Sequence, residues 1–208
     1  MLRFKNLNIQ LPNIIVRIRA NTKNGPKAIL VIFGVLIAVS VPNFSLSIKR
    51  ARDASRKDDM GSLQAALNTY FKDFGEFPKS TSDGRIIGCK APGSIVKKDA
   101  QGKLLVDYLP CEWGKDSLLS PVDGSRQPYI SPLPNDPQRA QGLTYFYISD
   151  GSRYQIYGSL EDTSQDEYDK KIVARGISCG TRTCNFGRAS GRTPLNISIE
   201  EYEQTLQK

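Results

Sequence analysis

Four cysteines are the residues whose chemistry the sequence indicates most directly. They are Cys89, Cys111, Cys179 and Cys184. An even number of cysteines in an exported domain is typical of disulfides, and four cysteines allow three pairings. We favour Cys179–Cys184, which closes a short loop, and Cys89–Cys111, which closes a longer one. Zinc is the alternative, but the chain has no Cys-x-x-Cys pair and no histidine, which such sites usually need.

Acidic side chains at residues 161–167 supply oxygen ligands of the kind that calcium binds. Glu161, Asp162, Asp166 and Glu167 lie there, directly after a predicted strand. Their spacing does not match an EF-hand loop. A calcium site and a plain acidic loop therefore both remain open, and we call residues 161–167 the acidic loop.

The chain has no histidine, and this excludes most of the common catalytic arrangements. A His general base and a Ser-His-Asp triad are both ruled out. Glycines at 187–191 and beside Cys179 lack the spacing of a phosphate-binding loop. The sequence therefore predicts a protein that is not an enzyme and needs no cofactor apart from the calcium considered above.

A charge-free stretch at residues 28–48 is the first element that would position the rest of the chain. Lys27 and Lys49 bracket it, and its first part is almost wholly apolar. As a helix it would span about 31 Å, close to the hydrocarbon thickness of a bilayer. We therefore predict a transmembrane helix at 28–48. Small residues at 38–40 leave a cleavable secretory signal as the alternative.

The distribution of charge predicts how this helix is oriented. The net charge of +8 arises before Asp53, because residues 1–52 contain basic residues and no acid. Basic residues ahead of an apolar segment mark the cytoplasmic side of a membrane. We therefore expect a basic cytoplasmic leader at 1–27, a single pass through the cytoplasmic membrane, and the rest of the chain outside. A nucleic-acid binder would carry its basic patch on the folded domain, so no nucleic acid is expected as a partner of the head.

Residues 49–77 predict an amphipathic helix that continues from the apolar one. One face repeats at three- and four-residue steps, through Met60, Leu63, Leu67, Tyr70 and Phe74. Gly75 and Pro78 are typical of the end of a helix. The pattern therefore predicts one long N-terminal helix with a membrane half and an amphipathic half.

The remaining residues, 78–208, predict a disulfide-bonded head with a small antiparallel sheet. Residues 143–148 and 153–160 read as strands, and Ser-Asp-Gly-Ser at 149–152 predicts the hairpin turn between them. Residues 171–175 are a candidate third strand, and Ser198 with Glu201 forms a capping box before a final helix. We expect an α+β fold in which the long helix packs on this sheet.

Several stretches resemble the type IV pilins and type II secretion pseudopilins of bacteria. The stem is similar in Val-Pro-Asn-Phe at 41–44 and through residues 49–78, which end in Phe-Pro. The head is similar in Leu-Pro-Asn-Asp-Pro at 133–137, Tyr-Phe-Tyr at 145–147 and Asp-Gly-Ser-Arg-Tyr-Gln-Ile-Tyr at 150–157. The resemblance covers residues 28–78 and 130–162.

The resemblance implies a structural subunit, a major or minor pilin or pseudopilin of a type IV pilus-like or type II secretion filament. Such a filament, periplasmic or extracellular, would serve cell adhesion or protein transport. Its stem helix would associate with itself or with other pilin subunits. Gly25 is then the candidate for leader cleavage, with Pro26 following it. Some pseudopilins bind calcium after the sheet hairpin, where Glu161, Asp162 and Asp166 lie. The alternative is a membrane-anchored binding or scaffold protein that does not polymerise.

Arginines make the C-terminal region basic, at Arg175, Arg182, Arg188 and Arg192. A role in adhesion or DNA uptake is one interpretation of these charges. An ordinary charged surface is the other.

Overall fold

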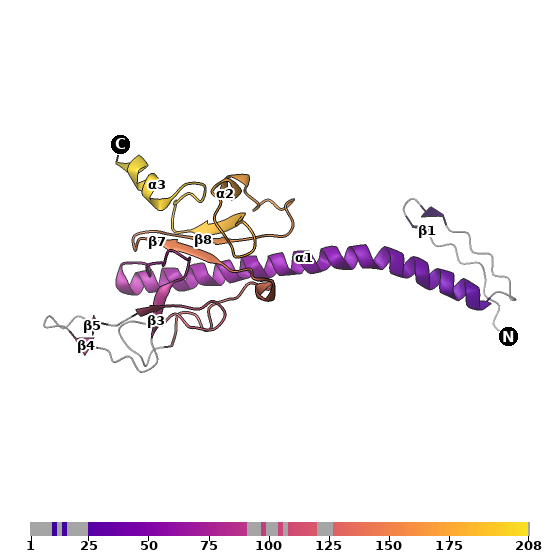
Figure 1. The fold of residues 1–208 in the computed structure, drawn as a ribbon, viewed down its shortest axis with the longest axis horizontal. Helices are drawn as coiled ribbons and strands as arrows, with labels where there is room; N and C mark the ends of the chain where they lie inside the picture. The colour runs from indigo at the N-terminus through magenta and orange to yellow at the C-terminus, as the bar shows by residue number, and fades with distance from the viewer. Residues whose placement is uncertain are drawn as a thin grey trace. The chain divides into compact units, whose positions relative to one another are not determined.

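The structure is a computed structural model that describes residues 10–11, 14–15, 25–90, 97–98, 104–105, 108–119 and 127–207. The chain divides into two compact units, Met1–Ile48 and Lys49–Lys208 (Figure 1). The fold is α+β, with helices and small antiparallel sheets, as the sequence predicts. Most of the predicted leader at 1–27 lies outside the described residues.

The N-terminal unit, Met1–Ile48, contains a short strand pair and the first part of the longest helix. Strand β1 (Gln10–Leu11) pairs antiparallel with β2 (Ile14–Ile15), and helix α1 (Gly25–Phe74) begins at the candidate cleavage residue. Large apolar side chains on α1 are exposed, with exposed fractions of 71% at Leu30 and 69% at Phe44. Among the described residues, no helix is both long enough and apolar enough to cross a bilayer.

The larger unit, Lys49–Lys208, contains the amphipathic part of α1 and the hydrophobic core. The repeat that the sequence indicates points inward, since Met60, Leu63 and Leu67 are fully buried. The helix ends at Phe74, earlier than residue 77, because Gly75 adopts a positive φ of 76° and its N–H donates to the Phe71 carbonyl. Phe77 then turns back into the core.

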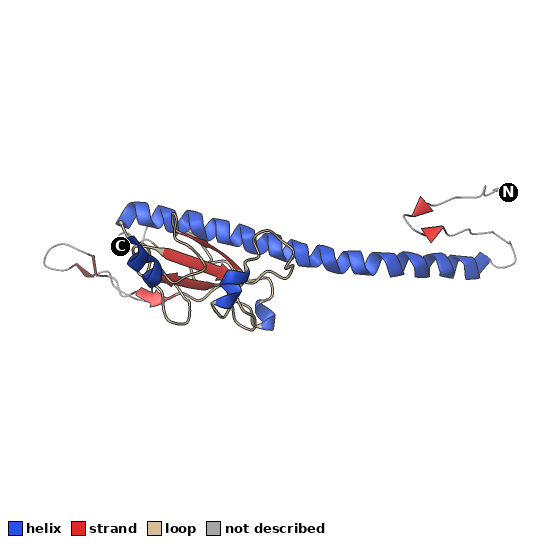
Figure 2. Ribbon diagram, turned by 90° about the horizontal axis from the view of Figure 1, so that it is seen from above, coloured by secondary structure: helices blue, strands red, loops and turns tan. Residues whose placement is uncertain are grey.

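A three-stranded antiparallel sheet packs against this part of α1 (Figure 2). Strand β7 (Phe146–Ser149) pairs with β8 (Tyr154–Gly158), which confirms the predicted hairpin. The third strand is β9 (Phe186–Ala189), paired with β8. The predicted strand at 171–175 is wrong. Residues 171–174 belong to helix α2 (Lys170–Ala174), and Arg175 is the C-cap of that helix. The Asp169 carboxylate caps this helix by accepting a hydrogen bond from the Lys171 N–H.

The remaining elements are short. Strand β3 (Ile87–Lys90) pairs with β6 (Tyr108–Pro110), and β4 (Lys97–Lys98) pairs with β5 (Leu104–Leu105). The 3₁₀ helix η2 (Arg139–Gln141) precedes β7. Helix α3 (Ile199–Leu206) is the predicted final helix, and the Ser198 hydroxyl accepts a hydrogen bond from the Glu201 N–H as its cap.

Candidate functional site

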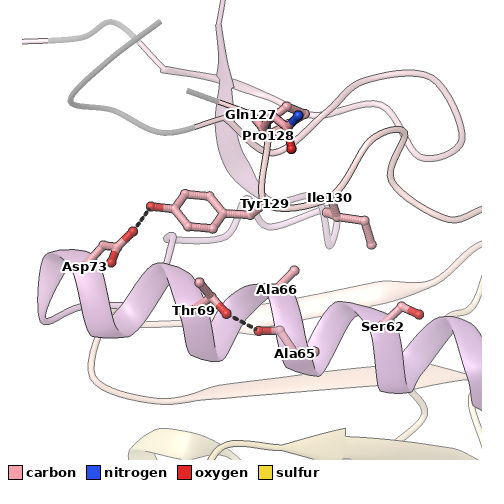
Figure 3. Close-up of a pocket in the computed structure, with 9 residues that line it drawn as sticks. All are labelled: Ser62, Ala65, Ala66, Thr69, Asp73, Gln127, Pro128, Tyr129 and Ile130. Carbon is pink, nitrogen blue, oxygen red and sulfur yellow. Dashed lines mark hydrogen bonds between the residues drawn. The ribbon is translucent and has the colours of Figure 1, made fainter. Parts of the chain in front are cut away.

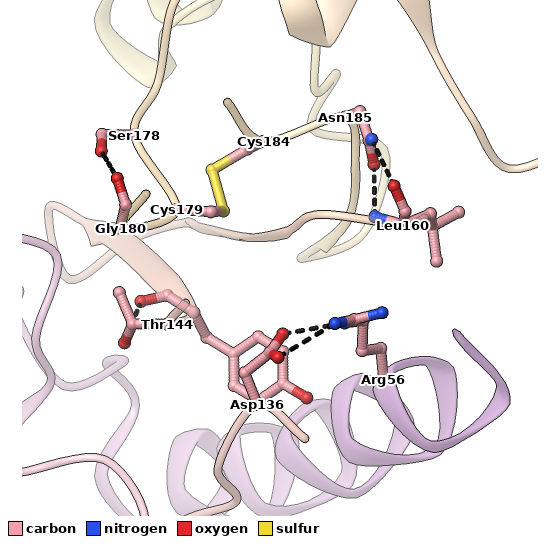
Figure 4. Close-up of a disulfide and its surroundings, with 10 residues drawn as sticks. Arg56, Asp136, Thr144, Leu160, Ser178, Cys179, Gly180, Cys184 and Asn185 are labelled. Atoms are coloured by element: carbon pink, nitrogen blue, oxygen red, sulfur yellow. Dashed lines mark hydrogen bonds and ion pairs between the residues drawn. A yellow bond between two sulfur atoms is a disulfide. The ribbon is translucent and has the colours of Figure 1, made fainter. Parts of the chain in front are cut away.

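A fully buried arginine forms the centre of the most highly connected polar cluster in the described chain. Arg56 lies on the inner face of α1 and has no exposed surface. Its Nε and Nη2 contact the two carboxylate oxygens of Asp136 at 2.8 and 3.0 Å (Figure 4). Its Nη1 donates to Asp53 at 2.7 Å and to Glu161 at 3.1 Å. We call Arg52, Arg56, Asp53, Asp136 and Glu161 the arginine clamp.

Asp53 connects the clamp to the backbone of the acidic loop. Its carboxylate accepts hydrogen bonds from the N–H groups of Glu161 and Asp162, at 2.9 and 3.0 Å. It also accepts one from the Gln165 side-chain amide at 2.7 Å. Charge-assisted hydrogen bonds of this kind are stronger than neutral ones, so one helix residue fixes the path of the chain after β8.

Glu161 is held on the outer side of the clamp by two arginines. Arg52 Nη2 donates to one of its oxygens at 2.6 Å, and Arg56 Nη1 contacts the other. Hydrogen bonds from Arg52 and Arg56 outweigh the effect of burial and lower the pKa of Glu161 to about 2. Burial opposes the charge of Arg56, but the hydrogen bonds that it donates to Asp136 raise the pKa of Arg56 above its usual value. Both groups therefore stay ionised throughout the physiological range.

Further basic residues of α1 contact the rest of the acidic loop. Lys57 Nζ lies 2.7 Å from Glu167, and Arg50 Nε lies 3.9 Å from Asp162. These outer pairs are more exposed, so solvent screens them and they contribute little to stability. The buried core of the clamp, in contrast, holds the acidic loop and residue 136 against the helix.

The predicted calcium ligands take part in other interactions. Glu161 binds the arginines, and Asp162 accepts hydrogen bonds from the N–H and hydroxyl of Ser164 at 3.0 and 2.5 Å. Asp166 lies exposed in the same loop. No group of three metal-binding side chains occurs among the residues that the structure describes. The geometry thus brings Glu161 together with arginines rather than with Asp162 and Asp166.

Both favoured disulfides are present in the structure. Cys89 and Cys111 join β3 to the residue after β6, with their Cα atoms 5.1 Å apart. Cys179 and Cys184 close a short loop before β9, also at 5.1 Å (Figure 4). Next to it, the Asn185 side chain exchanges two hydrogen bonds with the backbone of Leu160, at 2.7 and 2.9 Å. The second disulfide loop is therefore tied to the beginning of the acidic loop.

A groove runs along the outer side of α1 in the larger unit (Figure 3). It has a volume of about 640 Å³ and lies between small residues of the helix, such as Ala65 and Ala66, and residues 127–130. The Tyr129 hydroxyl donates to Asp73 at 2.5 Å and closes one end of the groove. Asp73 is the only charged residue among the described residues that line it, and the others offer mainly packing surface.

Comparison with known proteins assigns no family to this arrangement. No model of a protein family matches the chain, and no solved structure matches it. A curated protein, histone-lysine N-methyltransferase ASHH2 of Arabidopsis thaliana, is 29% identical over 114 residues, which are 52% of this chain. The chain spans 6% of the length of that protein. A match of this extent transfers no function.

The sequence indicates only part of the clamp. Arg52, Asp53 and Arg56 stand out as charges at helical spacing, which favours pairs within the helix. Arg56 makes such a pair with Asp53 but also reaches Asp136, which is 80 residues away along the chain. The one signal was the location of Asp136 inside the pilin-like Leu-Pro-Asn-Asp-Pro stretch.

Glu161→Gln is expected to reduce the acid sensitivity of the larger unit. The pKa of Glu161 is about 2 when folded and 4.5 ordinarily, so its charge stabilises the fold above pH 4.5 and this contribution is lost as the pH falls toward 2. The glutamine variant should be less stable at pH 7 and lose less stability between pH 4.5 and 2. Urea unfolding at several pH values measures both effects. A variant curve parallel to that of the wild type would contradict the assignment.

Proposed function

We propose that this chain is a structural subunit of a type IV pilus-like or type II secretion filament. The observation that carries the proposal is helix α1, which joins an apolar segment to an amphipathic one without a break. The amphipathic segment is buried against a small antiparallel sheet, and the apolar one exposes its side chains. A filament built from such stems covers the apolar segment with other stems, because exposed apolar surface of this extent favours association.

The proposal places residues 28–48 in the cytoplasmic membrane before assembly, with the N-terminus inside and the head outside. Two observations support this orientation. Basic residues without acids precede the apolar segment. All four cysteines are joined as disulfides, which persist in oxidising compartments outside the cytoplasm.

The arginine clamp has a mechanical role in this proposal. A head carried on a filament must transmit force to its stem without separating from it. Arg56 and Asp53 fix residue 136 and the acidic loop to the stem helix. Buried charged groups that are fully paired favour one arrangement over alternatives in some systems, and we extend that idea to this junction.

A bulky charge on the exposed face of the stem tests the filament directly. Ala54 is exposed on α1, and Ala140 is exposed on η2. We expect Ala54→Arg to reduce the chain in sheared filament fractions on the order of tenfold, since a buried clash or unpaired charge at an interface costs several kcal/mol. Ala140→Arg should assemble as the wild type does. Both heads should unfold at the same urea concentration, which separates assembly from folding.

The mature N-terminus provides an independent readout. Mass spectrometry of the filament fraction should find a chain that starts after its leader, with Gly25 as the candidate boundary. An intact Met1 together with an absence of filaments would contradict the proposal.

That result would favour a second candidate, a membrane-anchored binding or scaffold protein that does not polymerise. The observation behind it is Pro26, which directly follows Gly25. Proline lacks an amide hydrogen and has a fixed φ, so it is a poor residue after a cleavage site. Membrane fractions would then contain the full chain, and Ala54→Arg would leave its distribution unchanged.

A further inference from the structure

A second cavity lies beside the clamp, on the side of the Cys179–Cys184 loop. It has a volume of about 410 Å³. Its walls come from the start of the larger unit, the chain after β8 and the disulfide loop. The polar side chains that matter most are those of Lys49, Ser159, Thr163, Tyr168, Arg182 and Thr183.

The acceptor groups of this cavity are already in use. Both carboxylate oxygens of Glu161 contact arginines of the clamp. The Asn185 amide is saturated by the backbone of Leu160. A ligand that needed acceptors from the protein, such as a metal cation, would find none free at these two residues.

The donor groups, in contrast, have no hydrogen-bond partners among the described residues. Ser159 is only 2% exposed, yet its hydroxyl bonds to no described residue. The same holds for the hydroxyls of Thr163, Tyr168 and Thr183 and for the cationic groups of Lys49 and Arg182, apart from an attraction between Lys49 and Asp162. These hydroxyls and cationic groups are therefore available to donate to a ligand in the cavity.

We propose that this cavity binds a phosphate group. A phosphate offers several oxygens and negative charge to donors that converge from three segments of the chain. Arg182 supplies a planar fork that suits phosphate oxygens, and Lys49 supplies a point charge. Ser159, which is only 2% exposed, adds a hydroxyl that can donate to a phosphate oxygen.

Two sources could provide the phosphate, a lipid headgroup or free phosphate. Lys49 directly follows Ile48, the last residue of the apolar stretch. If the proposed function is correct, that position lies at the depth of the headgroups while the stem is in the membrane. Only this choice of source rests on the proposed function, because the cavity belongs wholly to the larger unit.

Titration of the full chain in a non-ionic detergent with inorganic phosphate tests the site. At constant ionic strength we expect saturable shifts of the amide resonances of residues 159–163 and 182–183. Arg182→Gln and Lys49→Gln should each weaken phosphate binding and raise the apparent Kd by roughly tenfold or more, as expected for hydrogen bonds to a charged group. Ser159→Ala should weaken it by a smaller factor. Arg192→Gln removes an exposed arginine outside the cavity and should leave the Kd unchanged.

Vesicles identify the source. Stronger binding to vesicles with phosphatidylglycerol than to phosphatidylcholine vesicles, together with competition by inorganic phosphate, identifies the lipid. Inorganic phosphate binding without a vesicle preference identifies the free anion. The proposal is overturned if no saturable shifts appear, or if Arg192→Gln weakens binding as much as Arg182→Gln does. Filament yield is measured separately on the wild type, so phosphate binding without filaments rejects the proposed function and leaves this site intact.

Discussion

Replacing Arg56 with alanine is expected to lower the free energy of unfolding of the larger unit by about 3–5 kcal/mol. The guanidinium contacts Asp53, Asp136 and Glu161 and is fully buried. Its removal takes away the cation that Asp53 and Asp136 contact, while Glu161 keeps its pair with Arg52. A domain is stable by about 5–15 kcal/mol, so this single change removes a large part of the total. Urea unfolding followed by circular dichroism measures the loss.

Asp136→Asn is the milder variant to use if Arg56→Ala does not fold. It keeps the shape of the side chain and removes one charge from the bidentate pair. Arg192→Ala is the matched control, because Arg192 is exposed and surface substitutions are usually within about 0.5 kcal/mol of the wild type. If Arg56→Ala were as stable as this control, the clamp would have no role in holding the head to the stem.

Much of the fold could be predicted because its signals are local. The three- and four-residue repeat from Met60 to Tyr70 is a property of one segment, and those side chains form the core. The β7–β8 hairpin follows from a turn between two alternating stretches. The cap at Ser198 depends on residues three positions apart.

The third strand could not be found in this way. Ile172 and Val173 are β-branched and favoured a strand, but the cap at Asp169 starts a helix whose Ile172 packs with Tyr157 and the second disulfide. The true strand, Phe-Gly-Arg-Ala at 186–189, has weak strand character. It forms because β8 offers an unpaired edge beside it, which is a tertiary effect.

The arginine clamp and the cavity beside it could not be predicted from the sequence for a related reason. The sequence predicts that charges at 52–56 lie on a helix, but not which loop covers them. The sequence offers Glu161 as a candidate calcium ligand, with a plain acidic loop as the alternative, because carboxylates gather there. Only the fold reveals that Arg52 and Arg56 of α1 face that loop and donate hydrogen bonds to both carboxylate oxygens of Glu161.

The two disulfides are expected to differ in their contribution to stability according to the loops they close. Cys89–Cys111 has a separation of 22 residues and Cys179–Cys184 one of 5. Loop-closure entropy predicts a loss of about 3.4 kcal/mol when the first pair is removed and about 2 kcal/mol for the second. Paired Cys→Ala variants, unfolded in urea under non-reducing conditions, measure each loss.

Packing adds to the difference in the same direction. Cys89 and Cys111 belong to the main core with Trp113 and Leu118, whereas Cys179 and Cys184 belong to the smaller cluster. The Cys179–Cys184 variant should therefore retain a cooperative transition, and its effect should concentrate on the cavity beside Arg182. An equal or larger loss for the short loop would mean that native contacts around Asn185 and Leu160, rather than the entropy of the unfolded chain, set the contribution of that bond.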